Sequence, residues 1–170
     1  MNHDPTAADR LGLRGVLNVG ATFYAALDRF PSALLALIFR IAVAAVFWKS
    51  GLTKLPNWDA TVFLFAEEYK VPLLPPEVAA YMAVILELSC PVLLVLGLLT
   101  RPAAAALLGM TLVIQTFVYP LAWGDHLLWA ALLLFLVTRG PGALSLDHWL
   151  GRLLGAQSSY PEGRGKQETC

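Results

Sequence analysis

Apolar residues are gathered along the chain into four long runs, separated by short polar or proline-rich stretches. A run of about 20 apolar residues is long enough to cross a bilayer as a helix. The pattern therefore predicts four membrane-spanning helices, over residues 33–54, 76–99, 103–119 and 125–138. The last run is short for a span, and it comes closer to full length if it begins near Leu121.

Two other segments carry apolar residues at helical spacing on one side only. They are residues 11–30, which are interrupted by glycines, and residues 145–155, which are rich in leucine. Amphipathic helices of this kind lie in the membrane interface. Residues 55–75 mix aromatic and acidic side chains between prolines and predict a third interfacial helix, which either covers the outer end of the bundle or is a simple connector with aromatic anchors.

Together these elements predict an all-α protein, a four-helix transmembrane bundle with flanking interfacial amphipathic helices. We expect a cytoplasmic N-terminal segment with its interfacial helix over 1–32, the bundle over 33–139, and a cytoplasmic interfacial helix with a polar tail over 140–170. Composition agrees, since 58% of the residues are hydrophobic and 14% are charged, against about 45–50% and 25% in soluble domains. A net charge of zero argues against nucleic acid as a partner, because binding it needs a concentrated basic face.

Basic residues are divided unequally between the two expected sides of the membrane. Short cytoplasmic loops and ends carry the excess of Lys and Arg, so both termini should be cytoplasmic and residues 55–75 should lie outside. The N-terminus lacks the pattern of a cleaved signal peptide, and we expect the first span to act as an uncleaved insertion signal. The residues counted on the cytoplasmic side are Arg10, Arg14, Arg29, Arg101, Arg139, Arg152, Arg164 and Lys166, and those outside are Lys54 and Lys70.

Glu87 lies near the middle of the second predicted span. A carboxylate at that depth costs several kcal/mol unless it is paired, protonated or hydrated, so it should face the interior of the bundle. In the first span, Arg40 shares one helical stripe with Gly51 and Lys54, whereas Lys49 points the opposite way. We therefore predict that Glu87 pairs with Arg40, with Lys49 as the rival partner. Such a pair either forms part of a functional site or simply locks the bundle.

Further polar groups are expected near this pair. Pro91 removes the backbone hydrogen bond to the carbonyl of Glu87 and leaves an acceptor beside the carboxyl group. Gln115 adds a side-chain amide from the third span. His126, at the start of the fourth span, is either a proton carrier or metal ligand, or a polar residue of the interface.

The order and spacing of four motifs resemble the DoxX family of small bacterial membrane proteins. They are Arg40 followed by FWKSGLTKL, the stretch VPLLPP, Glu87 before Pro91 and LGLLTR, and the closing RGPGALSLD. The resemblance covers roughly residues 34–150 and implies a four-helix protein of the bacterial inner membrane. Relatives include the DoxD-type subunit of thiosulfate:quinone oxidoreductase, and other members are associated with redox and thiol-stress partners. Arg40, Gly51, Lys54 and Glu87 match the family's recurring polar and glycine positions.

The resemblance and the polar core favour a redox-associated subunit, part of a quinone-linked oxidoreductase, with quinone as the candidate ligand. A quinone needs hydrogen-bond donors to its two carbonyl oxygens and a source of protons. Glu87 and Arg40 are the candidate catalytic residues. No haem, flavin or iron–sulfur signature is present, so electrons would come from the substrate or from a partner such as a peripheral redox protein. The candidate ligand-binding residues are Arg40, Gly51, Lys54, Glu87 and Gln115.

Two alternatives stay open. The chain is a non-enzymatic scaffold or partner for a peripheral protein, or it assists transport of a small solute or metal, with His126 and Cys90 as ligands. Four short helices leave little room for a transport path unless the chain forms a homo-oligomer. Its two cysteines, Cys90 and Cys170, form neither a CxxC pair nor, by our expectation, a disulfide, which argues against direct dithiol exchange.

Overall fold

The computed structural model describes residue 24 and residues 30–153 of the chain. The regular elements within this part are all helical, which confirms the all-α prediction. The interfacial helix predicted over residues 11–30 and the polar tail fall outside the described residues, save for Tyr24 and Phe30.

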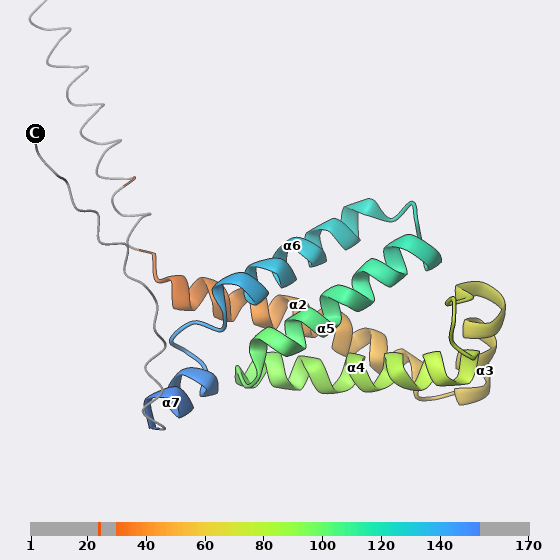
Figure 1. Ribbon diagram of the computed structural model, residues 1–170, viewed down its shortest axis with the longest axis horizontal. Coiled ribbons are helices and arrows are strands. Elements are labelled where there is room, and N and C mark those ends of the chain that lie inside the picture. The colour runs from red at the N-terminus through yellow and green to blue at the C-terminus, as the bar shows by residue number, and fades with distance from the viewer. Residues whose placement is uncertain (1–23, 25–29, 154–170) are drawn as a thin grey trace, which may run out of the picture.

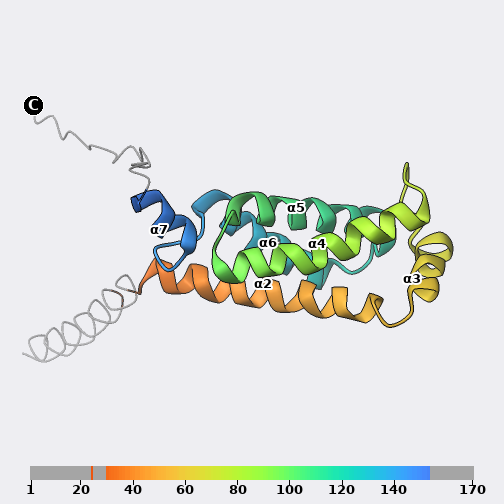
Figure 2. The same cartoon turned by 90° about the horizontal axis from the view of Figure 1, so that it is seen from below.

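Four long helical segments form the body of the molecule (Figures 1 and 2). They are α2 (Ser32–Lys54), α4 (Pro76–Leu96), α5 (Thr100–Val113) with its continuation η2 (Ile114–Val118), and α6 (Trp123–Arg139). Helix α4 packs between α2 and α5, and α6 packs on α5 and closes the ring against α2. The four segments run alternately up and down along the bundle (Figure 1), and the connection from α2 to α4 carries α3 and η1.

The two ends of the bundle are covered differently. At one end lie the short helix α3 (Trp58–Leu64) and the π-helical turn η1 (Phe65–Tyr69), and at the opposite end lies α7 (Leu146–Leu153) (Figure 1). The short helix predicted within residues 55–75 is therefore present, and so is the one predicted over 145–155. The Ser145 hydroxyl accepts a hydrogen bond from the amide of His148 at 3.2 Å and so caps α7.

The predicted helix boundaries hold for the first span and shift in the next two. Helix α4 ends at Leu96 because Gly97 adopts a left-handed conformation with φ 69°. The amides of Gly97 and Leu98 then bond to the last carbonyls of the helix, which is a common way for a helix to end. Helix α5 begins at Thr100, within the stretch for which the sequence predicts a turn.

Three helical segments in the described part of the chain are long and apolar enough to cross a membrane, namely Ser32–Lys54, Pro76–Leu96 and Thr100–Val118. Helix α6 has 17 residues and is about 26 Å long, at the lower limit for a span. Its role as a fourth span stays a prediction. Many large apolar side chains on the outside of the bundle are about half exposed, which suits a surface in contact with lipid; examples are Ile38, Ile41, Ile85, Leu112 and Leu134.

Candidate functional site

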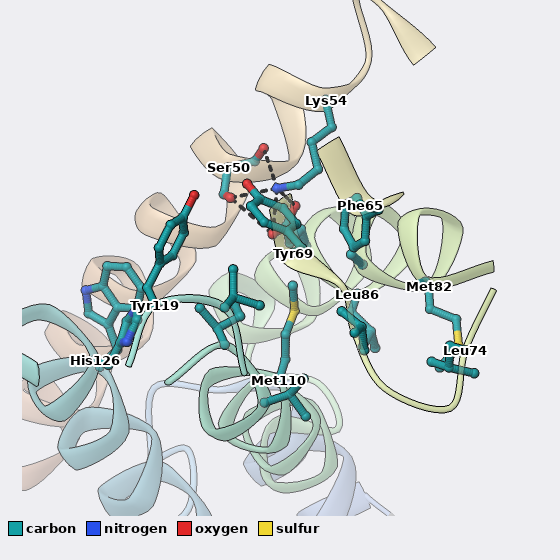
Figure 3. Close-up of a pocket in the computed structure, with 18 residues that line it drawn as sticks. Ser50, Lys54, Phe65, Tyr69, Leu74, Met82, Leu86, Met110, Tyr119 and His126 are labelled. Carbon is teal, nitrogen blue, oxygen red and sulfur yellow. Dashed lines mark hydrogen bonds and ion pairs between the residues drawn. The ribbon is translucent and has the colours of Figure 1, made fainter. Parts of the chain in front are cut away.

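An apolar cavity of about 380 Å³ lies inside the bundle, at the end covered by α3 and η1. Its walls come from α2, η1, α4, α5, η2 and α6. Figure 3 shows Lys54 and Ser50 at one side of it, His126 and Tyr119 at another, and Met82 and Leu74 away from these polar groups. The volume falls within the range of about 300–1,000 Å³ that is usual for small-molecule sites.

A buried ion pair forms part of the wall. Lys54 Nζ lies 2.7 Å from Glu87 Oε2 and 2.9 Å from Oε1, and the Ser50 hydroxyl donates a hydrogen bond to Oε1 at 3.0 Å. Lys54 and Glu87 are only 8% and 2% exposed, so neither charge is solvated by bulk water. The pair is neutral overall, and its mutual hydrogen bonds offset the cost of holding two charges in the bundle.

Gly51 allows the two charged side chains to meet. A Cβ atom at this position would lie 2.7 Å from Leu88 Cδ2 and 3.1 Å from Glu87 Cβ. The missing side chain therefore lets α2 approach α4 closely, as small residues do in membrane helices. Lys54 lies about one turn beyond Gly51 on the same face of α2, from which its long side chain reaches the carboxylate.

His126 is held on another wall by a chain of hydrogen bonds. Its Nδ1 lies 2.7 Å from Gln115 Oε1, and Gln115 Nε2 donates to the carbonyl of Pro120 at 2.8 Å. Because a carbonyl can only accept, the bond to Pro120 fixes which end of the Gln115 amide faces the histidine. Gln115 Oε1 then accepts from Nδ1–H, and in the neutral ring Nε2 carries the lone pair.

Tyr69, Tyr119 and Glu68 form a second polar group at the edge of the cavity. The Tyr119 hydroxyl donates to Glu68 Oε1 at 2.7 Å, and its ring packs edge-on against that of Tyr69, with the centroids 5.8 Å apart. The carboxylate of Glu68 raises the pKa of Tyr119, and burial raises the pKa of Tyr69. Both phenols therefore stay protonated at neutral pH and join η1, which covers the cavity, to the end of η2.

Two widened turns shape the cavity. In η1 the amide of Lys70 donates to the carbonyl of Phe65 at 3.0 Å. In η2 the amide of Tyr119 donates to the carbonyl of Ile114 at 2.8 Å. Such π-helical turns are rare and are found frequently at functional sites. Each of the two contributes two residues to the lining of the cavity, Phe65 and Tyr69 from η1 and Ile114 and Val118 from η2.

The predicted pairing of Arg40 with Glu87 is wrong. The Arg40 guanidinium donates to the carbonyls of Pro141 at 2.9 Å, Leu144 at 2.8 Å and Val95 at 3.1 Å. Val95 lies eight residues beyond Glu87, about 12 Å along α4. The rival, Lys49, is exposed. Arg40 thus fastens the connection between α6 and α7 to the far end of the bundle, and it does not line the cavity.

Residues of the closing motif RGPGALSLD form further hydrogen bonds at the same end of the bundle. Asp147 accepts hydrogen bonds from the amides of Leu99 at 2.8 Å and Thr100 at 3.0 Å, and so caps the start of α5. The carbonyls of Pro141 and Leu144, from the same motif, are the ones that Arg40 binds. A motif that resembles the family therefore has a structural role at the end opposite the cavity.

The structure places the predicted site residues in different parts of the bundle. Lys54 and Glu87 line the cavity, Gln115 bonds to His126, and Gly51 contacts α4 without lining the cavity. Arg40 lies at the opposite end. Cys90 belongs to the apolar core. Among the described residues no three or more His, Cys, Asp and Glu side chains gather as a metal site.

Sequence reasoning did not identify Ser50, Tyr69 and Tyr119 as polar groups of the cavity. For Ser50 the available signal was its distance of four residues from Lys54, which places the two on adjacent turns of one helix. For the two tyrosines the sequence gives no signal beyond their places at the ends of η1 and η2, because their meeting depends on how η1 folds back over the bundle.

Comparison with known proteins agrees with this architecture. Residues 35–120, about half of the chain, match the family model described as DoxX. The chain belongs to the DoxX family. The matched region runs from α2 through α3, η1, α4 and α5 to the end of η2, and thus supplies most of the cavity.

Two relatives illustrate the similarity. The chain is 35% identical over 128 residues to the inner membrane protein YphA of Escherichia coli K12, covering 67% of this chain and 89% of that protein. It is 32% identical over 131 residues to an uncharacterized protein of Haemophilus influenzae, covering 68% and 83%. No solved structure matches the chain. This DoxX protein is thus an integral, multi-pass protein of the inner membrane.

Proposed function

We propose that this DoxX protein is a redox-associated membrane subunit that binds a quinone in the cavity beside Lys54 and Glu87. The observation that carries the proposal is the cavity itself, an apolar chamber with a few buried polar groups inside a membrane bundle. Ligand sites typically combine a mostly apolar lining with a small number of placed polar groups.

The cavity opens at a surface that suits a lipid-soluble ligand. Leu74, Met82 and Val113 line the cavity and are also between 38% and 48% exposed, so the opening is bordered by apolar side chains. A ligand that carries a long apolar tail can leave that tail at the lipid-facing surface while its ring lies inside. Water-soluble solutes would gain little from such an entrance.

The residues present fit the ring of a quinone. Apolar and aromatic side chains, among them Phe65, Met110 and Trp129, provide the flat and dry surroundings that an aromatic ring prefers. When bound, a quinone would supply two-electron chemistry linked to protons. The chain's own contribution would be to exclude water, to orient the ring, and to place protonatable groups at Glu87 and His126.

A cavity-filling substitution tests the proposal. Ala83 lines the cavity and is buried, so Ala83→Phe should occupy it, whereas Ala45→Phe adds the same ring on an exposed face of α2. We expect purified wild type and Ala45→Phe to carry an extractable quinone, and to bind a short-chain benzoquinone, while Ala83→Phe does neither. A co-purifying protein with no quinone in any variant would favour the scaffold function instead.

A further inference from the structure

Some hydrogen-bonding groups of the cavity are already bonded within the protein, and others remain free to bind a ligand. An ammonium group has three N–H donors, and Lys54 Nζ has four acceptors within reach, the two oxygens of Glu87 and the hydroxyl and carbonyl of Ser50. The Ser50 hydroxyl itself donates a hydrogen bond to Glu87. The donors of this group are therefore used within the protein.

At the edge of the cavity, the Tyr119 hydroxyl is also used, because it donates to Glu68. The indole N–H of Trp129, which is part of the lining, has no acceptor among the described residues. Its ring lies beside that of His126, with the centroids 5.2 Å apart.

Two acceptors, in contrast, remain available. Glu87 Oε2 accepts only from Lys54 among the described residues, so a carboxylate oxygen with two lone-pair positions keeps one of them. His126 Nε2 has no bonded partner among the described residues. The buried side-chain atoms without a partner in the described part are Arg40 Nε and Thr100 Oγ1, so Nε2 is not sealed off from the cavity.

The histidine tautomer decides what Nε2 recognises. Gln115 requires Nδ1 to be the donor, because its own amide is oriented by the carbonyl of Pro120. In the neutral ring Nε2 is then an acceptor, and it matches an O–H group. A ligand hydroxyl can donate to Nε2, whereas a ligand carbonyl has no hydrogen to donate and cannot form this bond.

We infer that the cavity prefers the reduced, dihydroxy form of its ligand, a quinol, over the oxidised quinone, and that His126 sets this preference through Nε2. The inference rests on the proposed function and adds to it the redox form that is bound and the residue that selects it. His126 is the specificity-determining residue, and Gln115 is the positioning residue that fixes its tautomer.

Binding of the two redox forms of one molecule tests the inference. A short-chain benzoquinone and the same compound kept reduced under anaerobic conditions are titrated by calorimetry into the full-length protein in detergent. We expect the reduced form to bind about tenfold more tightly, the effect of one well-placed hydrogen bond of about 1.4 kcal/mol. His126→Phe should bring the ratio of affinities close to one, because the acceptor that distinguishes the two forms is removed. Gln115→Leu should lower the ratio in part, because either tautomer becomes accessible.

A matched control uses the other described histidine, His148 in α7, which lies outside the cavity. His148→Phe should keep the wild-type ratio. Equal binding of the two forms by the wild type, or tighter binding of the oxidised form, would overturn the inference but leave quinone binding intact. Retention of the preference by His126→Phe would overturn the role of His126. Failure of the wild type to bind either form would contradict the proposed function itself.

Discussion

Lys54 Nζ lies 2.7 Å from Glu87 Oε2, and this buried ion pair joins the end of α2 to the middle of α4 on the wall of the cavity. The relationship connects architecture with the proposed function, because the same two charges hold the helices together and border the ligand site. It also accounts for Gly51, which brings the two helices close enough for the pair to form.

Removing one member of the pair should cost more than removing both. Lys54→Met or Glu87→Met alone leaves an unpaired buried charge, and we expect a loss of about 3–5 kcal/mol of stability. The double variant should recover most of that loss, as measured by unfolding in detergent. The exposed charges Lys49 and Glu77 provide the control, since Lys49→Met and Glu77→Met should change stability little. Strictly additive losses in the double variant would show that the two side chains are not coupled.

The sequence predicted the elements better than the contacts. Spans over 33–54 and 76–99 follow from apolar length alone, and the structure agrees to within about three residues. The stripe of α2 that holds Arg40, Gly51 and Lys54 also follows from helical spacing. Spacing along a helix fixes which residues share a face.

The partner of Glu87 could not be predicted in the same way, because it depends on how α2 and α4 are placed relative to each other. The opposite facing of Lys49 on the first span favoured Arg40, and Lys54 lies at the very end of the same helix. The carbonyl partners of Arg40 include those of residues 141 and 144, on a connection between helices whose path the pattern does not define. The role of His126 likewise depends on the amide of Gln115 and the turn at Pro120, which bring together residues eleven apart in the chain.

Gly51 should not tolerate a side chain. Gly51→Ala places a methyl group 2.7 Å from Leu88 Cδ2 and 3.1 Å from Glu87 Cβ, so α2 and α4 must move apart or Leu88 must shift. We expect a loss of about 1–3 kcal/mol, typical of an overpacked contact. At Gly109, in α5, an added Cβ atom would meet no heavy atom within 4 Å, and Gly109→Ala should be neutral or stabilise by up to about 1 kcal/mol. Equal effects of the two substitutions on thermal unfolding would rule out close packing at Gly51.

Arg40 should stabilise the end of the bundle opposite the cavity. Arg40→Met removes the donors to three carbonyls, and we expect faster hydrogen exchange at the amides of residues 142–149. Arg40→Lys should restore only part of the protection, because an ammonium cannot reproduce the fork of the guanidinium. Binding of a benzoquinone should survive in both variants. Loss of that binding with normal exchange at 142–149 would place Arg40 in the ligand site instead.

The orientation of the bundle is tested by labelling single cysteines. In a variant that lacks Cys90 and Cys170, we expect Ala60→Cys, on exposed α3, to react with a membrane-impermeant maleimide added to intact spheroplasts. Arg101→Cys, at the opposite end of the bundle, should react only after the membrane is permeabilised. The reverse pattern of labelling would place the termini outside and the cavity near the cytoplasm.

The central claim is that the cavity bordered by Lys54, Glu87 and His126 holds a quinone. Photo-crosslinking with an azido-benzoquinone, followed by mass spectrometry of the labelled peptides, tests it most directly. We predict labels on lining residues, such as Leu86 of α4, Met110 of α5 and Trp129 of α6, and their loss in Ala83→Phe. Labels confined to outward-facing residues such as Ile85 and Leu112, unchanged by Ala83→Phe, would contradict the claim.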